Sequence, residues 1–246
     1  MDLDNQSIYD ANWQCWLDMK VHGPASRWLR FLIRSQLDAT ANSTTIKSVL
    51  DVGCGEGTTT HFLAKLLPDA QVLGTDFSKA GVQCAQSRYS RTNLSFLYDE
   101  DLRHLDGQYD LVSAFEVLEH VENWQDFLRR LSRSARQFIW LSFPTGRMRP
   151  FEKQSGHYRN FKHGEVEGFL SSCDFTTRIV FYAGFPFYSP FYRDLCNATY
   201  AVSKSFTAGG YGPGKILISH LFYYLFRFCS TKHRLGDQFC GLFVRT

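Results

Sequence analysis

Short apolar runs alternate with amphipathic stretches through the middle of the chain. The runs are bounded by glycine, proline or polar residues, which is typical of buried strands. Between them, apolar positions recur at helical spacing, as in residues 59–67, 80–89 and 165–173. Strands that alternate with short helices form βαβ units, so we expect an α/β fold with a mostly parallel sheet and helices on both faces. The seven predicted strands are residues 48–52, 71–75, 94–98, 109–114, 138–143, 178–182 and 239–244.

The start of the chain and the segment before the last strand depart from this alternation. Residues 12–37 predict one helix or two short ones, interrupted at Gly23-Pro24. Residues 185–236 separate the last two strands and contain 13 aromatic side chains, which favours a helical insertion over a solvated loop. We therefore divide the chain into N-terminal helices at 1–45, an α/β core at 46–184, the insertion at 185–236 and a closing strand at 237–246.

The insertion contains a predicted helix at residues 215–229 that is apolar apart from a narrow stripe. This helix can be buried against a second predicted helix at 190–205, or it can line an aromatic pocket for an apolar ligand. It can also make peripheral contact with a membrane interface. Few Lys or Arg residues flank it, so we rank the membrane last. The polar stripe consists of Lys215, Ser219, Tyr223 and Arg227, at steps of four.

The composition is that of a globular chain of 246 residues. Lys and Arg number 27 and Asp and Glu 24, and this net charge of +3 argues against nucleic acid as a partner. The seven cysteines form no C-x-x-C pair, which argues against a zinc ribbon or a disulfide scaffold. There is no signal-like N-terminal segment and no apolar run of membrane-spanning length. We expect a reduced, cytoplasmic protein.

A glycine-rich turn follows the first predicted strand and precedes a predicted helix. Gly53, Gly55 and Gly57 allow the backbone to turn sharply and to approach a ligand closely. Ligands of open α/β sheets bind beyond the carboxyl ends of the strands, where this turn lies. Asp76 ends the next strand, 23 residues after Gly53, where a carboxylate can accept both hydroxyls of a ribose. Phe77 follows it and can pack on an adenine face.

Two features argue against a dinucleotide in this turn. Thr58 stands where the pattern G-x-G-x-x-G requires a third small residue. Asp51 lies two residues before the first glycine, where a carboxylate would repel a pyrophosphate and attract an ammonium group. A nicotinamide-dependent oxidoreductase is therefore a rival to be tested and not the preferred interpretation.

Further motifs follow in a fixed order. After L-D-V-G-C-G-E-G come G-T-D-F-S, F-L-Y-D-E-D-L, Y-D-L-V and E-V-L-E-H-V. This order resembles the class I S-adenosylmethionine (SAM) methyltransferases over residues 46–183 and the closing strand. The resemblance implies a Rossmann-like sheet of seven strands with an antiparallel last strand. It also implies SAM as cofactor, S-adenosylhomocysteine (SAH) as product, and N-terminal helices that fold over the pocket as a lid.

The resemblance also implies which residues contact SAM. The turn lines the methionine and ribose end, and the acidic run after the third strand holds the adenine. By position, these residues are Asp51, Gly53, Cys54, Gly55 and Gly57 in the turn, Asp76 at the ribose, Asp99 and Glu100 at the adenine, and Phe115 or Glu116 at the methionine part.

Glu116, Glu119 and His120 form an E-x-x-E-H motif. On a helix, this spacing places the three side chains on one face, where they favour a bound cation or a shared proton. The motif resembles that of ubiquinone-pathway O-methyltransferases and small-RNA end methyltransferases, in which it can hold a divalent metal. A helix N-terminus, whose dipole favours carboxylates, also explains it. We prefer a site without metal.

Residues 156–161, G-H-Y-R-N-F, resemble a segment that lies over the active site in methyltransferases of this type. His157 is the candidate general base because the ordinary pKa of histidine lies near neutrality. Tyr158 is expected to hold the acceptor, and His120 is the third catalytic candidate. The surrounding loop is cationic, which favours an acceptor with an anionic group unless the loop is merely solvated. Its basic residues are Arg147, Arg149, Lys153, Arg159 and Lys162.

Together, the motifs predict a SAM-dependent methyltransferase that transfers a methyl group to oxygen or nitrogen of a small molecule. The N-terminal helices and the insertion would select the acceptor. The alternatives are a lipid-linked or RNA-end methyltransferase, and a non-catalytic binding partner that keeps the fold. The sequence makes no prediction of the oligomeric state.

Overall fold

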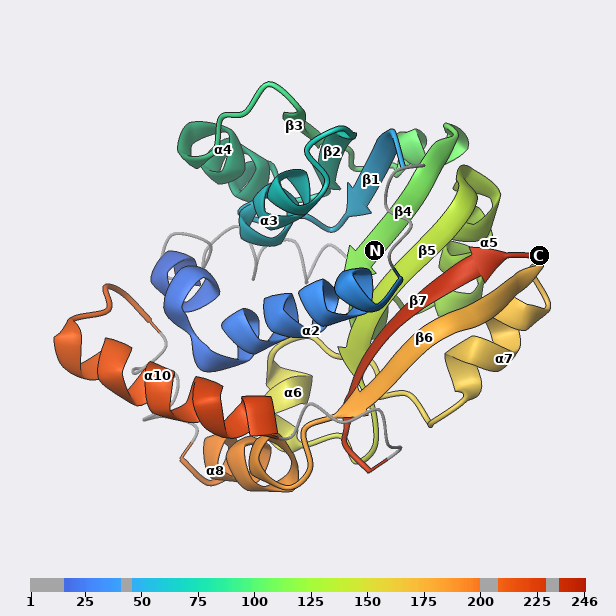
Figure 1. Ribbon diagram of the computed structural model, residues 1–246. Helices are drawn as coiled ribbons and strands as arrows, with labels where there is room; N and C mark the ends of the chain where they lie inside the picture. Colours follow the sequence, from blue (N-terminus) through green and yellow to red (C-terminus); the bar gives the residue numbers. More distant parts are fainter. Residues whose placement is uncertain (1–15, 41–45, 200–207, 229–234) are drawn as a thin grey trace.

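Seven strands form a single sheet in the computed structural model, which describes residues 16–40, 46–199, 208–228 and 235–246 (Figure 1). The strand order is β3-β2-β1-β4-β5-β7-β6, and β7 runs antiparallel to both of its neighbours. The predicted Rossmann-like class, with an antiparallel last strand, is therefore confirmed. The strands are β1 (Ser48–Val52), β2 (Gln71–Asp76), β3 (Leu94–Tyr98), β4 (Tyr109–Phe115), β5 (Ala135–Pro144), β6 (Phe175–Ala183) and β7 (Gln238–Arg245).

Helices cover both faces of this sheet (Figure 1). A short helical segment at residues 16–22 precedes α2. Within the described ranges, no helix is both long and apolar enough to cross a bilayer. The helices are α2 (Pro24–Thr40), α3 (Thr58–Leu66), α4 (Lys79–Arg88), η2 (Arg103–Asp106), η3 (Leu118–His120), α5 (Trp124–Ser134), α6 (Pro150–Gln154), α7 (Glu165–Ser171), η4 (Phe187–Tyr192), α8 (Arg193–Ala198) and α10 (Pro213–Phe228).

Two apolar layers bury the sheet. On one face, Trp28 and Leu32 of α2 and Leu63 of α3 pack against Val49 and Leu111 of the sheet. On the other face, α5 and α7 supply the corresponding apolar side chains. Strand β4 is buried from its second residue to its last because helices cover it on both sides. Each fully buried Leu contributes about 1.5–3 kcal/mol to stability relative to an exposed one.

The insertion differs from the prediction in its first half. In place of a helix over 190–205, a π-helical turn, η4, is followed by the short helix α8, and residues 200–207 lie outside the described part. Pro190 explains the irregular turn because proline cannot donate a backbone hydrogen bond. The helix predicted at 215–229 is observed as α10. It packs on α2 and on η4.

Candidate active site

A cavity of about 320 Å³ lies at the carboxyl ends of β1, β2 and β4. This is the place where open α/β sheets bind ligands, and the volume suits a small molecule. Ten of the predicted site residues line it. They are Asp51, Gly53, Cys54, Gly55, Asp76, Phe77, Phe115, Glu116, His120 and His157.

The glycine turn forms the floor of this cavity. Gly53 has a φ of +76°, and a Cβ at this position would lie 2.4 Å from Cγ2 of Val117. Gly55 also has a positive φ, and its backbone N–H points at the Asp76 carboxylate. Gly57 does not line the cavity. A Cβ there would meet Ala85 and Phe96, so Gly57 allows close packing of the turn. Its predicted contact with the ligand stays a prediction.

Replacing Gly53 by alanine is expected to lower the free energy of unfolding by at least about 2 kcal/mol, because the substitution adds a clash with Val117 to a left-handed backbone. Urea denaturation would measure the loss. Gly212→Ala is the matched control, since a Cβ there meets no described atom within 4 Å. Equal stability of the two variants would contradict the proposed constraint on the turn.

The Asp76 carboxylate is fixed by two backbone groups at the end of β2. Oδ2 accepts the N–H of Gly55 at 2.7 Å, and Oδ1 accepts the N–H of Ser78 at 2.8 Å. Both bonds leave acceptor capacity on each oxygen because a carboxylate oxygen has two lone pairs. The side chain thus lies in the cavity as a rigid, buried double acceptor.

Asp51 lies beside it at the end of β1. Its carboxylate accepts the hydroxyls of Ser113 and Thr60, both at 2.6 Å. Burial raises the pKa of Asp51 to about 6, and the two hydrogen bonds limit the rise. A carboxylate that is stripped of water in this way gains most from a cationic ligand group.

Three titratable side chains meet at the other end of the cavity. One ligand atom each of Glu119, His120 and His157 lies within 4.8 Å of the other two. His120 Nδ1 donates to the carbonyl oxygen of Gly156 at 3.0 Å, which places the lone pair on Nε2. Oε2 of Glu119 is buried and has no hydrogen-bond partner among the residues that the structure describes.

Burial sets the protonation of this cluster. It lowers the pKa of His120 to about 3 and that of His157 to about 4, and it raises the pKa of Glu119. Both imidazoles are therefore uncharged near neutral pH, and burial favours the protonated form of Glu119. Two neutral imidazoles beside a desolvated carboxyl group can accept a proton or bind a divalent metal.

Glu116 is not part of this cluster, which corrects the prediction of one helical face. The E-x-x-E-H segment is a three-residue 3-10 turn, and Glu116 precedes it with a φ of +57°. Its Oε1 accepts from Ser142 Oγ at 2.7 Å and from Gln238 Nε2 at 2.8 Å. Glu116 lines the cavity separately, and His157 takes its place beside Glu119.

Comparison with known proteins assigns the domain that carries this cavity. Residues 50–137 match a family model described as a methyltransferase domain. This part of the chain is therefore similar to methyltransferase domains. Among curated relatives, the ubiquinone biosynthesis O-methyltransferase of Bordetella parapertussis is 32% identical over 114 residues, or 44% of this chain and 46% of that protein. The malonyl-[acyl-carrier protein] O-methyltransferase of Bacillus cereus is 32% identical over 85 residues, or 34% of this chain and 31% of that protein.

These matches leave much of each protein uncovered, because the chain spans about half the length of the first of these relatives and less of the second. The fold of the whole chain is similar to that of solved structures. The magnesium protoporphyrin IX methyltransferase of Synechocystis PCC 6803, crystallised with SAM, superposes with a TM-score of 0.59 at 17% identity. The alignment covers 100% of this chain and 99% of that one. At this identity, the likeness shows the fold alone.

Besides Gly57, three predicted site residues lie outside the cavity lining. The Asp99 carboxylate accepts the backbone N–H groups of Arg103 and His104, at 2.8 and 2.9 Å, and so begins η2. Glu100 is exposed and accepts the hydroxyl of Tyr98. The backbone N–H of Tyr158 donates to the carbonyl oxygen of Glu119 at 2.9 Å, which ties its loop to the E-x-x-E-H turn. Their predicted contacts with a ligand stay predictions.

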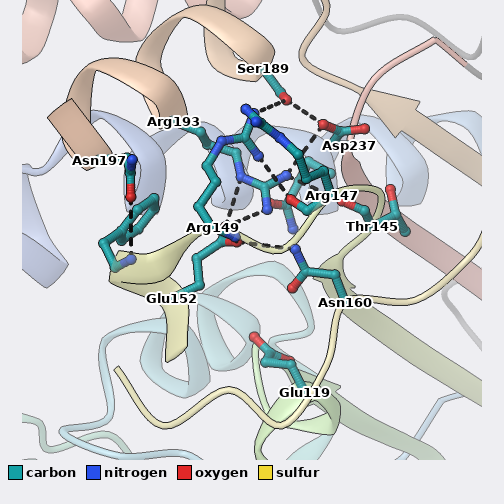
Figure 2. A network of polar contacts seen from close by, with 12 residues as sticks. Glu119, Thr145, Arg147, Arg149, Glu152, Asn160, Ser189, Arg193, Asn197 and Asp237 are labelled. Carbon is teal, nitrogen blue, oxygen red and sulfur yellow. Dashed lines mark hydrogen bonds and ion pairs between the residues drawn. The ribbon is translucent and has the colours of Figure 1, made fainter. Parts of the chain in front are cut away.

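Two of the five basic residues of the loop pair with an acidic side chain of α8. Arg147 and Arg149 both bond to Asp194, at 2.8 and 2.6 Å. Figure 2 shows Arg149 beside Arg193, whose Nε donates to Glu152 at 2.8 Å. This network connects α6 to α8, with Arg193 and Glu152 buried in it and Arg147 exposed.

The opposite wall of the cavity comes from the N-terminal helices. Met19 and Lys20 of residues 16–22 line it, followed by Trp28 and Arg30 of α2. Residues 12–15 of the predicted N-terminal helix lie outside the described part. No local motif marks the wall residues. Their position depends on how α2 packs over the sheet, which sequence periodicity does not specify.

Proposed function

We propose that this protein is a SAM-dependent O-methyltransferase that acts on a hydroxyl group of an apolar or aromatic small molecule. The observation that carries the proposal is the single cavity that joins two buried carboxylates at one end to two neutral histidines at the other. The O-methyltransferase names of the curated relatives support the choice of oxygen.

The first end fits the cofactor. The two acceptor oxygens of Asp76 suit the ribose hydroxyls, and Asp51 suits the ammonium group. The glycine turn leaves room for the chain between them, and Phe77 offers a ring for the adenine. When bound, SAM supplies a methyl group on a positively charged sulfur. The protein's part is to hold the acceptor in line and to exclude water.

Ionisation of Asp51 is expected to make cofactor binding pH-dependent. A ligand ammonium favours the ionised carboxylate, whose pKa is about 6 in the free protein. The affinity for SAH is therefore constant above this pH and falls as the pH decreases through 6, approaching about tenfold per pH unit. Titration calorimetry between pH 5 and pH 8 measures the profile.

Asp51→Asn is the matched variant for this prediction because it keeps an acceptor oxygen and removes the charge. It should bind SAH more weakly and without the decline below pH 6. A wild-type affinity that does not change across the range would show that Asp51 does not bind the ammonium group.

The second end fits a hydroxyl acceptor. A hydroxyl must lose its proton on methylation, and His157 lines the cavity as a neutral imidazole that can accept it. His120 packs edge-on against it, with ring centroids 4.6 Å apart, and is held by Gly156. Trp28 and Tyr188 add an aromatic wall, which favours an apolar or aromatic acceptor.

Product analysis tests the proposal. The protein is incubated with SAM and a metabolite extract, and the products are searched for the mass gain of one methyl group. We expect a methylated phenol or alcohol, together with thermal stabilisation by SAH and not by NAD. Stabilisation by NAD instead would favour the oxidoreductase. Binding of SAH without any product would favour a non-catalytic partner.

The unpartnered Oε2 of Glu119 supports a second candidate, in which the same transfer is assisted by a divalent metal. Glu119, His120 and His157 would hold the ion, which would lower the pKa of a bound hydroxyl. This candidate predicts one-to-one binding of Mn²⁺ or Zn²⁺ with release of a proton, and no binding to a Glu119→Gln variant. Full activity in the presence of a chelator would exclude it.

A further inference from the structure

Helix α10 exposes a continuous apolar strip. Its members follow one another at steps of three and four, opposite the buried Ser219 and Phe226. Leu217 is 71% exposed, Leu221 61% and Phe228 82%. Large apolar side chains that gather in this way mark an interaction surface. The outer strip consists of Leu217, Ile218, Leu221, Tyr224 and Phe228.

The buried side of α10 lies directly behind the cavity. Phe226 contacts Trp28 and Tyr188, with ring centroids 5.6 and 5.3 Å away, and both of these residues line the cavity. Figure 1 shows α10 on the outer side of α2, at one end of the molecule. A partner that covers the outer strip would therefore lie one helix away from the acceptor end of the cavity.

Charge is distributed unevenly between the insertion, residues 185–236, and the rest of the chain. Residues 185–236 contain six Lys or Arg and a single acidic residue, Asp194. One of the six, Arg193, is buried against Glu152, which leaves five. The remaining residues contain 21 Lys or Arg and 23 Asp or Glu. The sequence of α10 itself has no acidic residue, and Lys215 and Arg227 lie near its two ends. The partner of this segment should therefore carry negative charge.

We propose that the outer strip docks on the anionic surface of a lipid membrane, with α10 lying in the plane of the interface. The helix of 16 residues is too short to span a bilayer but presents an exposed apolar face, with Lys215 near its start and Arg227 near its end. The exposure of the strip raises the membrane from the last-ranked interpretation of this helix to the preferred one.

A second copy of the chain fits this surface less well. A two-fold contact would place the positive segment against itself, and like charges would oppose each other. The anionic membrane offers both opposite charge and an apolar layer. In combination with the proposed function, on which this step rests, docking would bring membrane-dissolved acceptors to the aromatic wall of the cavity.

Co-sedimentation with vesicles tests the inference. The vesicles contain equal parts of phosphatidylglycerol and phosphatidylcholine, and a second set contains phosphatidylcholine alone. We expect the protein to sediment with the first set, and to be released by salt or by omission of the anionic lipid. The double variant Leu217→Glu/Leu221→Glu should bind these vesicles at least about tenfold more weakly than the wild type. Because both side chains are exposed, it should fold normally.

Leu97→Glu is the matched control, since Leu97 is 43% exposed on β3, at the opposite edge of the sheet. It should sediment like the wild type. Failure of the wild type to bind anionic vesicles, or equal binding by the double variant, would overturn the inference. So would a wild-type dimer that the double variant dissociates. Calorimetry with SAH, without vesicles, tests the proposed function separately, because a protein that binds SAH but no vesicles loses only this inference.

Discussion

The Asp76→Asn variant is expected to bind SAH about 10- to 100-fold more weakly than the wild-type protein. Asparagine is isosteric and can still accept one of the two backbone N–H groups from Gly55 and Ser78. It removes the negative charge and replaces one acceptor by a donor, so one ribose hydroxyl loses its partner. Titration calorimetry measures the affinity, and the melting temperature shows whether the variant is folded.

Asp99→Asn provides a closely matched control. Asp99 is a buried carboxylate at the end of the next strand, and it also accepts two backbone N–H groups. Because it lies outside the cavity lining, its replacement should leave SAH affinity unchanged. Equal losses in both variants would show that the effect is structural. A loss in Asp99→Asn alone would restore the predicted adenine contact and remove Asp76 from the ribose.

The His157→Ala variant is expected to lower kcat by about 10²- to 10⁴-fold, the usual contribution of a positioned general base. SAH affinity should stay unchanged because His157 lies at the other end of the cavity. In the wild type, burial lowers the pKa of His157 to about 4, so the imidazole is neutral above this pH. The acidic limb of the kcat profile should therefore lie near pH 4 and not near the ordinary value of histidine.

His163→Ala is the control for this loop. His163 is exposed and packs at a tilt against Tyr182, with ring centroids 4.0 Å apart, and it does not line the cavity. Its replacement should leave turnover and the pH profile unchanged. If His157→Ala retained wild-type turnover, the proton would leave by another route, and His120 would be the next residue to replace.

The strands were predictable from sequence where buried apolar runs end at turns. The bounds of β1 and β3 agree with the prediction at both ends. β6 begins three residues earlier than predicted, at Phe175, because its pairing with β7 continues through the exposed residues 176–178. Exposed polar residues in a strand carry no apolar signal, so only the backbone pairing reveals them.

The candidate site was also predictable from the sequence only in part. Its cofactor end is built from one local motif and the end of the adjacent strand, and the order of these motifs predicted it. The acceptor end joins His120 to a loop 36 residues later, through the carbonyl oxygen of Gly156. The aromatic wall joins Trp28 to Tyr188, from opposite parts of the chain. Such contacts depend on tertiary packing and leave no periodic pattern in the sequence.

The most direct test of the account is a crystal structure of this protein with SAH. The account predicts the ribose hydroxyls within hydrogen-bond distance of Asp76, the ammonium group beside Asp51, and the sulfur facing His157 across the cavity. A complex in which SAH occupies another part of the surface, or in which side chains fill the cavity between Asp76 and His157, would contradict it.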